Sequence, residues 1–327
     1  MQAATRRGTL YSLGSVNADF QVRVEARPGS AETLQAHHFT RLSGGKAANV
    51  AFLARKLGHE VHLLGCVGRD DLASQALDAL VAAGVDVEGV ARVPGPTGTA
   101  MIAVPPDGKK HILLATNAND AWSEQAADAA RQRIESAAPP ALLAIDCEIP
   151  APIVARALDA AAARALPVVL DPSFADRVDP AWLPRLLAIT PNLEEAAQLG
   201  GVDPQDRDAA VRAARRLRAG GTPLVFVKLP DGGCLFECGD GGALIEAPPV
   251  EVVDATGAGD AFTAALAVAL LEEQPPIEAA RFAVACSTCA VRGYGSQPSY
   301  PDRDEVELVA AAVHAKAGDG ADAPWAR

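Results

Sequence analysis

Apolar and polar positions follow a regular pattern over the second half of this chain. From about residue 123, segments with helical periodicity alternate with short apolar runs of strand length. The expected elements are helix 123–137, strand 142–146, helix 152–166, strand 168–171, strand 188–190, helix 193–199, helix 208–219 and strand 224–229. This alternation predicts a doubly wound α/β fold, in which helices cover both faces of a mainly parallel sheet.

Two hairpin patterns interrupt this rhythm earlier in the chain. Residues 20–25 alternate apolar and polar side chains, and 34–42 is the expected partner strand. Strands at 99–104 and 111–115 flank a Pro-Pro-Asp-Gly turn. The pattern therefore predicts a small β-sheet lid lying over the main sheet. The expected division is an α/β domain of residues 1–16, 43–96 and 117–327, and a lid of residues 17–42 and 97–116.

The other expected elements fit the same architecture. They are strand 10–15, a helix ending near residue 57, strand 61–67, helix 71–83, a hairpin of 234–238 with 243–247, and helices 261–271, 278–291 and 304–316. Residues 317–327 are expected to form a frayed tail.

Residues 254–260, with the sequence Asp-Ala-Thr-Gly-Ala-Gly-Asp, carry the most specific chemical pattern. Gly257 and Gly259 leave the backbone bare, so amide N–H groups can approach an anion closely. The first turn of the following helix has unpaired N–H groups and the positive end of the helix dipole, where a phosphate fits. Asp260 beside it suits a base that removes a proton from an attacking hydroxyl. The alternative is that Asp260 is an N-cap and the glycines only form a turn.

A second glycine-rich helix start lies at residues 43–49, Ser-Gly-Gly-Lys-Ala-Ala-Asn. It lacks the first glycine and the final Ser/Thr of a Walker A loop. Lys46 and Asn49 are three residues apart and so lie near one face of the first turn, which suits a polyhydroxy ligand. Asn17 and Asp19 directly follow the first strand, where open α/β sheets bind ligands, although an Asx-turn would use the same residues.

Further polar residues follow later strands. Glu148 comes after strand 142–146, and Asn192 and Glu195 come after strand 188–190. The amide and carboxylate of Asn192 and Glu195 have a spacing suited to a hydrated Mg²⁺. Taken singly, each of these residues is more often a helix cap or a solvated side chain. Taken together, they line the sheet edge at which this fold class binds ligands.

Composition and charge exclude several other classes. The chain has 327 residues and a net charge of −12, which argues against a nucleic-acid surface. No apolar run reaches the roughly 18 residues of a membrane span, so a cytoplasmic protein is expected. A nicotinamide dehydrogenase is disfavoured because no G-x-G-x-x-G follows the first strand. The six scattered cysteines predict free thiols, including Cys286 and Cys289, whose spacing would also suit a redox or zinc site.

Six motifs in order resemble the ribokinase branch of the phosphofructokinase-B-type sugar kinase family. They are Gly14-Ser15-Val16-Asn17-Ala18-Asp19, Gly44-Gly45-Lys46-Ala47-Ala48-Asn49, Val67-Gly68-Arg69-Asp70, Thr190-Pro191-Asn192-Leu193-Glu194-Glu195, Asp254-Ala255-Thr256-Gly257-Ala258-Gly259-Asp260 and Gln297-Pro298-Ser299. One departure stands at 228–233, Lys-Leu-Pro-Asp-Gly-Gly, where the family often has Thr-x-Gly-x-x-Gly. Pro230 there has no N–H to offer a nucleotide, whereas Lys228 could place a positive charge near its phosphates.

The resemblance implies a role for each matching residue. Asp260 would be the general base, and the amides of Gly257, Ala258 and Gly259 would form an anion hole. The sugar would be held by Asn17, Asp19, Gly45, Lys46, Asn49, Glu148 and Asp260. The nucleotide side would comprise Asn192, Glu195, Lys228, Gly233, Gly257 and Gly259, with Glu195 holding Mg²⁺ through water. A potassium-like ion would lie near Asp254, Thr256, Gly295 and Ser299.

The function implied by the resemblance is transfer of the ATP γ-phosphate to a sugar hydroxymethyl, with D-ribose as the first expectation. ATP, Mg²⁺ and K⁺ are the expected cofactors, and a homodimer formed through the lid is expected. A nucleoside or ketose kinase of the same family is the main alternative. A non-catalytic sugar or nucleotide sensor on the same fold is a further one, which the retained acids and glycines of residues 254–260 disfavour.

Overall fold

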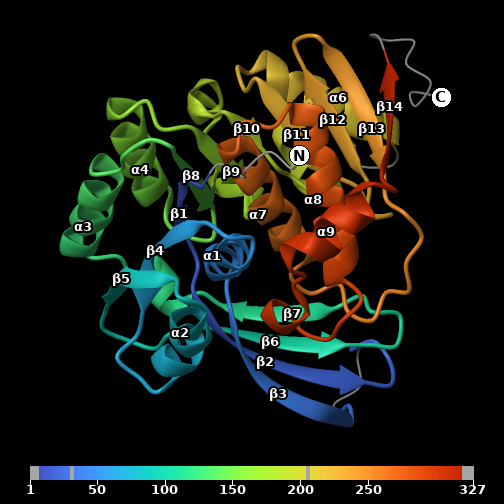
Figure 1. Cartoon of the computed structure of the whole chain (residues 1–327). Coiled ribbons are helices and arrows are strands. Elements are labelled where there is room, and N and C mark those ends of the chain that lie inside the picture. The colour runs from blue at the N-terminus through green and yellow to red at the C-terminus, as the bar shows by residue number, and fades with distance from the viewer. Residues whose placement is uncertain (1–6, 30–32, 204–206, 319–327) are drawn as a thin grey trace.

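The main sheet runs through the centre of the molecule (Figure 1). The computed structural model describes residues 7–29, 33–203 and 207–318. Within these ranges the sheet has ten strands in the order β14-β13-β12-β11-β10-β9-β8-β1-β4-β5. Seven are parallel: β1 (Thr9–Leu13), β4 (Glu60–Val67), β5 (Asp86–Arg92), β8 (Ala141–Asp146), β9 (Val168–Asp171), β10 (Ala188–Ile189) and β11 (Leu224–Lys228). The antiparallel extension is β12 (Cys234–Cys238), β13 (Gly241–Glu246) and β14 (His314–Gly318).

Helices cover both faces of this sheet, which confirms the predicted fold class. One face carries α1 (Lys46–Lys56), α2 (Leu72–Ala83), α7 (Ala258–Leu271), α8 (Pro276–Ala290) and α9 (Arg303–Ala310). The other carries α3 (Glu124–Glu135), α4 (Ala151–Ala163), α5 (Leu193–Gly200) and α6 (Arg207–Ala219). Because β8 is buried on both faces, it reads as a continuous apolar run rather than as an alternating one. Nearly every side chain of α7 is buried, as its apolar sequence predicts.

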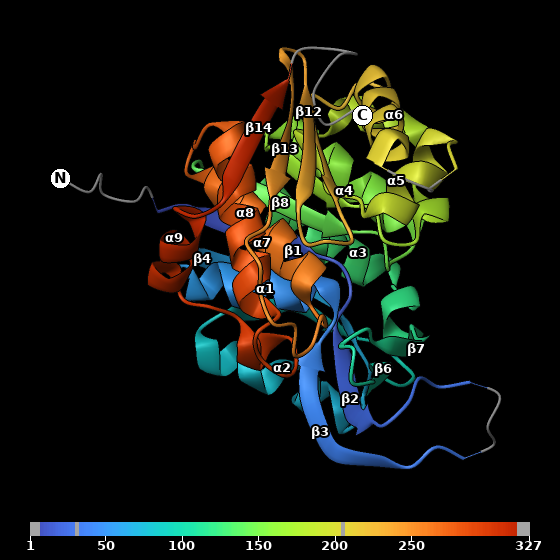
Figure 2. The ribbon, with the colours of Figure 1, turned by 90° about the vertical axis from the view of Figure 1, so that its right-hand side faces the viewer.

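A separate small sheet projects from one end of the molecule (Figure 2). Its strand order is β3-β2-β6-β7. The bounds are β2 (Asn17–Val24), β3 (Ala36–Gly44), β6 (Gly98–Val104) and β7 (His111–Ala115). The two predicted hairpins therefore do join into one sheet, through parallel pairing of β2 with β6. Strand β3 runs on to Gly44, slightly beyond the expected boundary, and the division into two domains stays a prediction.

Two elements differ from the expectation. Strand β5 was not predicted, because its half-buried sequence Asp-Val-Glu-Gly-Val-Ala-Arg lacks a clear strand pattern. The expected helix 304–316 is wrong in its second half, since α9 ends at Ala310 and β14 then pairs antiparallel with β13. The alanine-rich segment favours a helix locally, but pairing with the otherwise open edge of β13 overrides that preference. The first two residues of the expected tail, Ala317 and Gly318, belong to β14, and the rest of it lies outside the described residues.

The course of the chain through the main sheet creates a crevice. From β1 the chain passes to β4 and β5 on one side of that strand, then returns to β8 on its other side. In open α/β sheets ligands bind at such a switch point, outside the carboxyl ends of the strands. Asp146, the last residue of β8, connects the carboxyl ends of β1 and β8. Its carboxylate accepts hydrogen bonds from the amides of Ser15 and Glu148, both at 2.9 Å. Asn17 and Glu148 are thereby brought to one edge.

The cysteines fit the prediction of free thiols. All six are unpaired, and Cys286 and Cys289 are buried in α8. Within the described ranges, no three His, Cys, Asp or Glu side chains converge as direct metal ligands would. None of the helices in the part of the chain that the structure covers is long and apolar enough to cross a bilayer.

Candidate active site

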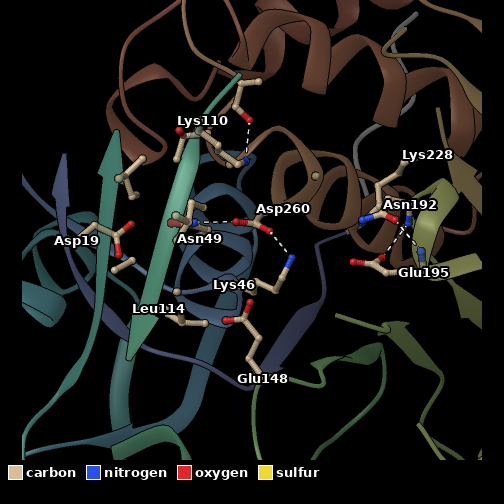
Figure 3. A pocket seen from close by; sticks show the side chains of 18 of the residues that line it. Asp19, Lys46, Asn49, Lys110, Leu114, Glu148, Asn192, Glu195, Lys228 and Asp260 are labelled. Atoms are coloured by element: carbon tan, nitrogen blue, oxygen red, sulfur yellow. Dashed lines mark hydrogen bonds and ion pairs between the residues drawn. The ribbon is translucent and has the colours of Figure 1, made fainter. Parts of the chain in front are cut away.

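A cavity of about 880 Å³ lies between the carboxyl edge of the main sheet and the small sheet (Figure 3). The small sheet contributes an apolar cover of Ala100, Ile102, Ile112 and Leu114. Most of the residues predicted from the sequence line the rest of the cavity. They are Asn17, Asp19, Gly45, Lys46, Asn49, Glu148, Asn192, Glu195, Lys228, Thr256, Gly257, Gly259 and Asp260.

Asp260 lies in the first turn of α7 and faces the cavity (Figure 3). The N-cap of this helix is Gly257, with φ of +76°, so the alternative that Asp260 is the N-cap is wrong. Asp260 is only 8% exposed, and its carboxylate accepts a 2.7 Å hydrogen bond from the Asn49 amide. Lys46 Nζ lies 3.4 Å from the other oxygen. Two cavity residues from α1 therefore hold this carboxylate in place.

The turn before α7 places backbone amides next to the Asp260 carboxylate. Within the described residues, the N–H groups of Gly257 and Gly259 donate no hydrogen bond, whereas Ala258 N–H points at the Ala255 carbonyl at 3.4 Å. A side chain at Gly257 would meet Ser296 Cβ and the Tyr300 hydroxyl oxygen, each at 2.6 Å. The turn therefore requires glycine and leaves bare donors at the positive end of α7, which can stabilise an anion.

Asp19 presents an unsatisfied acceptor. It is 5% exposed, and its Oδ1 has no hydrogen-bond partner in the described structure. Burial, followed by the charges of Asp260 and Glu148, raises the pKa of Asp19 to about 7. The carboxylate lies against Gly44, where an added Cβ would be 2.0 Å from Oδ2. A buried acceptor of this kind calls for a hydroxyl or water donor within the cavity.

Lys46 connects the two halves of the cavity. It is the first residue of α1, whose N-cap Gly45 has φ of +92°. Its ammonium lies 3.6 Å from Asp171 and 3.4 Å from Asp260. Burial opposes the charge of Lys46, but these two carboxylates and Glu148 outweigh it and hold its pKa well above the ordinary value. The ammonium is therefore a permanent positive charge beside Asp260.

The other end of the cavity combines Lys228 with the start of α5. Lys228 Nζ lies 2.8 Å from Asp171, whose pKa the lysine charges lower despite burial. Asn192 and Glu195 form a capping box with reciprocal 2.8 Å hydrogen bonds. Glu195 Oε2 is used in that box, while Oε1 accepts no hydrogen bond from the described residues. These two residues thus cap a helix and also line the cavity, and the second oxygen fits a water bound to Mg²⁺.

The residues expected near a monovalent cation lie together, directly beside the turn that precedes α7. The Asp254 carboxylate is fully buried, and Thr256 donates to Oδ1 through both its amide (2.8 Å) and its hydroxyl (2.6 Å). Oδ2 accepts from Gly295 N–H (2.9 Å) and from Gln21 Nε2 (2.5 Å). Ser299 Oγ donates to the Gly295 carbonyl at 2.6 Å. Because protein donors surround the carboxylate, a cation here would depend on backbone carbonyl oxygens.

Five predicted residues do not line the cavity: Ala258, Asp254, Gly295, Ser299 and Gly233. Gly233 lies in the turn after β11, where its N–H donates to Asp231 and its carbonyl accepts from Leu229.

Sequence reasoning missed Asn119, Gln21 and Lys110, and it gave no role to Gln297 of the sixth family motif. Asn119 donates to Asn17 Oδ1 at 2.7 Å and Gln297 donates to Asn49 Oδ1 at 3.1 Å, so each orients a predicted residue. Gln21 and Lys110 reach from the small sheet to the loop that precedes α7. The local sequence around Asn119, Gln21 and Lys110 shows only strand, loop or turn patterns, so no signal could have identified their partners. For Gln297, the Gln-Pro-Ser motif at residues 297–299 was the available signal.

Comparison with known proteins agrees with this geometry. Residues 8–303 match the model described as pfkB family carbohydrate kinase. A ribokinase of Haemophilus influenzae is 33% identical over 300 residues, which cover 91% of this chain and 97% of that protein. A deoxyribokinase of Salmonella typhi is 29% identical over 295 residues, covering 90% and 95%.

Solved structures show the same similarity. The ribokinase of Arabidopsis thaliana complexed with ribose and ATP has a TM-score of 0.78 and 30% identity, covering 93% of this chain and 99% of that one. The chain therefore belongs to the pfkB family of carbohydrate kinases as a ribokinase-like member, and it is a phosphotransferase with an alcohol group as acceptor.

Proposed function

We propose that this protein transfers the γ-phosphate of ATP to the hydroxymethyl group of a sugar, with D-ribose as substrate and ribose 5-phosphate as product. The observation that carries the proposal is the Asp260 carboxylate, held by Asn49 and Lys46 next to the bare amides at the start of α7. The ribokinases at 33% identity and the neighbour complexed with ribose and ATP support ribose as the acceptor.

The sugar subsite lies under the small sheet. Asp19 Oδ1 is free to accept from a sugar hydroxyl, and Asn17, oriented by Asn119, lies beside it. Lys46 and Glu148 line the same region of the cavity and supply a donor and an acceptor for further hydroxyls. The small sheet would act as a lid, whose apolar side chains exclude water and so limit wasteful hydrolysis of ATP.

The chemical step needs little more than a base and an anion-stabilising turn. Asp260 accepts the proton of the attacking hydroxyl as the in-line displacement proceeds. The negative charge on the transferring group is stabilised by the amides of Gly257, Ala258 and Gly259. The Lys46 ammonium, 3.4 Å from Asp260, places a positive charge beside the reacting carboxylate.

The nucleotide phosphates are proposed to lie toward Lys228 and the start of α5. Lys228 supplies a positive charge at 2.8 Å from Asp171, and Asn192 and Gly233 are the other proposed contacts. Mg²⁺ would be held by Glu195 through water, and it would neutralise charge on the phosphates. A monovalent cation beside Asp254 and Thr256 would polarise the anion-binding turn without touching the nucleotide.

The test is an ADP-release assay with a panel of acceptors. We expect ribose to be phosphorylated with the highest kcat/KM, ahead of nucleosides and ketoses, with K⁺ and Mg²⁺ varied as separate arms. Identification of the product as ribose 5-phosphate completes the assignment. A higher kcat/KM for a nucleoside or a ketose would replace ribose by that class, and ligand binding without ADP release would indicate a sensor instead.

The small sheet also has an exposed apolar face suited to self-association. Phe20 on β2 pairs with Met101 on β6, and Met101 in turn pairs with Leu113 on β7. Phe39 stacks on Phe20, and Leu113 is 74% exposed. A contiguous exposed apolar patch on a monomer marks an interaction site. We propose that a second copy of this chain covers it, forming a homodimer.

Leu113→Asp is expected to convert this dimer to a monomer, because it would bury an unpaired charge at the interface. Light scattering coupled to size-exclusion chromatography measures the change. Leu308→Asp is the matched control, since Leu308 on α9 is 76% exposed and lies outside the small sheet. A wild-type protein that is monomeric at micromolar concentration would contradict the proposal.

A further inference from the structure

Lys110 extends from the small sheet to the loop that precedes α7 (Figure 3). It lies in the connection between β6 and β7, and its Nζ donates a 3.1 Å hydrogen bond to the Ala255 carbonyl. The same connection makes a second contact, because Ala255 N–H points at the Gly108 carbonyl at 3.3 Å. Both backbone polar groups of Ala255 are therefore held by one turn of the small sheet.

The Ala255 carbonyl has a second donor with a role in catalysis. Ala258 N–H, one of the amides proposed to stabilise the transferring group, points at this carbonyl at 3.4 Å. That distance is beyond the usual range of an N–H···O hydrogen bond, whereas an ammonium at 3.1 Å is a charged and stronger donor. With Lys110 in place, the carbonyl keeps a partner when Ala258 N–H turns to an anion.

The Lys110 ammonium also interacts electrostatically with the charged residues of the cavity. Burial lowers the pKa of Lys110, and the charge of Asp260 is the largest influence that opposes this effect. The charged groups that face it come from five elements. They are Asp260 on α7, Lys46 on α1, Lys228 on β11, Asp254 in the loop and Asp19 on β2.

We propose that Lys110 is a positioning residue, through which the small sheet prepares the anion-binding turn for phosphoryl transfer. This inference rests on the proposed kinase function. When the small sheet covers the cavity, Lys110 keeps the Ala255 carbonyl hydrogen-bonded, so that Ala258 N–H can turn from this carbonyl to the phosphoryl group. When the small sheet moves away, the Ala255 carbonyl loses Lys110 and accepts the hydrogen bond of Ala258 N–H again. Phosphoryl transfer is therefore fast only when the small sheet covers the cavity.

Three variants test the assignment. Lys110→Met removes the charged donor and keeps the chain length, and Lys110→Arg keeps a charged donor. Lys109→Met is the matched control, because its exposed side chain is the neighbouring lysine in the same turn. We expect Lys110→Met to lower kcat by about ten- to a hundredfold, the range of a lost charged hydrogen bond, with the sugar KM within threefold of wild type. Lys110→Arg should recover part of kcat, and Lys109→Met should resemble wild type.

The pH profile gives a readout that a merely structural role would not move. In the wild type, kcat should fall at alkaline pH as Lys110 loses its proton. This alkaline limb should disappear in Lys110→Met and move to higher pH in Lys110→Arg. A Lys110→Met enzyme with unchanged kcat, or one altered only in sugar KM, would overturn the proposal.

A binding experiment separates this inference from the identity of the acceptor. The probe is aluminium fluoride with Mg²⁺ and ADP, which mimics the transferring phosphoryl group without any sugar. Lys110→Met should weaken the aluminium fluoride complex at least tenfold and leave the affinity for ADP with Mg²⁺ unchanged. Equal affinities of wild type and Lys110→Met for the mimic would refute the proposed role of Lys110. Failure of every sugar in the acceptor panel would instead contradict only the proposed substrate.

Discussion

Asp260→Asn should lower kcat by about two to four orders of magnitude, the usual contribution of a general base. The substituted amide is nearly isosteric and can still accept the hydrogen bond that Asn49 donates at 2.7 Å. It cannot accept the proton of the attacking hydroxyl, so chemistry is lost while the cavity keeps its shape. Steady-state kinetics with ATP and sugar, beside calorimetric titration of the sugar, measures the two effects separately.

Two results would distinguish a base from a structural residue at this position. Sugar affinity within a few-fold of wild type, together with the loss of kcat, supports the base. If kcat remained within tenfold of wild type, Asp260 would not be the base. Asp78→Asn serves as the control, because Asp78 is exposed on α2 and lies outside the cavity lining.

Asp19→Asn is expected to raise the KM for the sugar by about ten- to a hundredfold, since hydrogen bonds to a charged group contribute about 1.5–3 kcal/mol. Asp19 Oδ1 has no partner among the described residues, so the sugar supplies its donor. The pKa of about 7 adds a pH dependence. As pH falls through 7, Asp19 becomes protonated and a poorer acceptor, so the wild-type KM should rise, while the KM of Asp19→Asn should stay flat.

The same substitution should stabilise the free protein at neutral and alkaline pH. The folded pKa of Asp19 is raised from 3.8 to about 7, so its full contribution to stability is present below pH 4 and is lost as pH rises through 7. At about 1.4 kcal/mol for each pKa unit, the loss is at most about 4 kcal/mol. Asp19→Asn should therefore have a higher free energy of unfolding than wild type at pH 8.

Chemical denaturation of both proteins at pH 8 and pH 4 measures this difference. The stabilisation should shrink as the pH is lowered, because wild-type Asp19 is then protonated and uncharged. An Asp19→Asn protein that is less stable than wild type at pH 8 would show that the ionised carboxylate is satisfied within the fold, and the argument for a sugar donor would fail.

Local signals along the chain were enough to predict the fold class and most of the residues that line the cavity. The glycines of residues 44–49 and 254–260 lie at fixed spacing from Lys46 and Asn49 and from two acids, respectively, so their chemistry can be predicted without distant contacts. The alternation of helices and strands likewise depends on local periodicity. Asp19, which follows the first strand, and Asp260 are both predicted from such local signals, and both line the same cavity.

Long-range pairing decided the rest. The local composition around residues 304–316 favours a helix, but the open edge of β13 makes β14 a strand. Similarly, Lys110 and Gln21 are ordinary polar residues of the small sheet until folding brings them to Ala255 and Asp254. The sequence alone indicated which residues are candidates for binding a phosphate and a sugar, because those patterns are local. Only the tertiary structure determined which side chains orient them, because such contacts join residues more than a hundred positions apart.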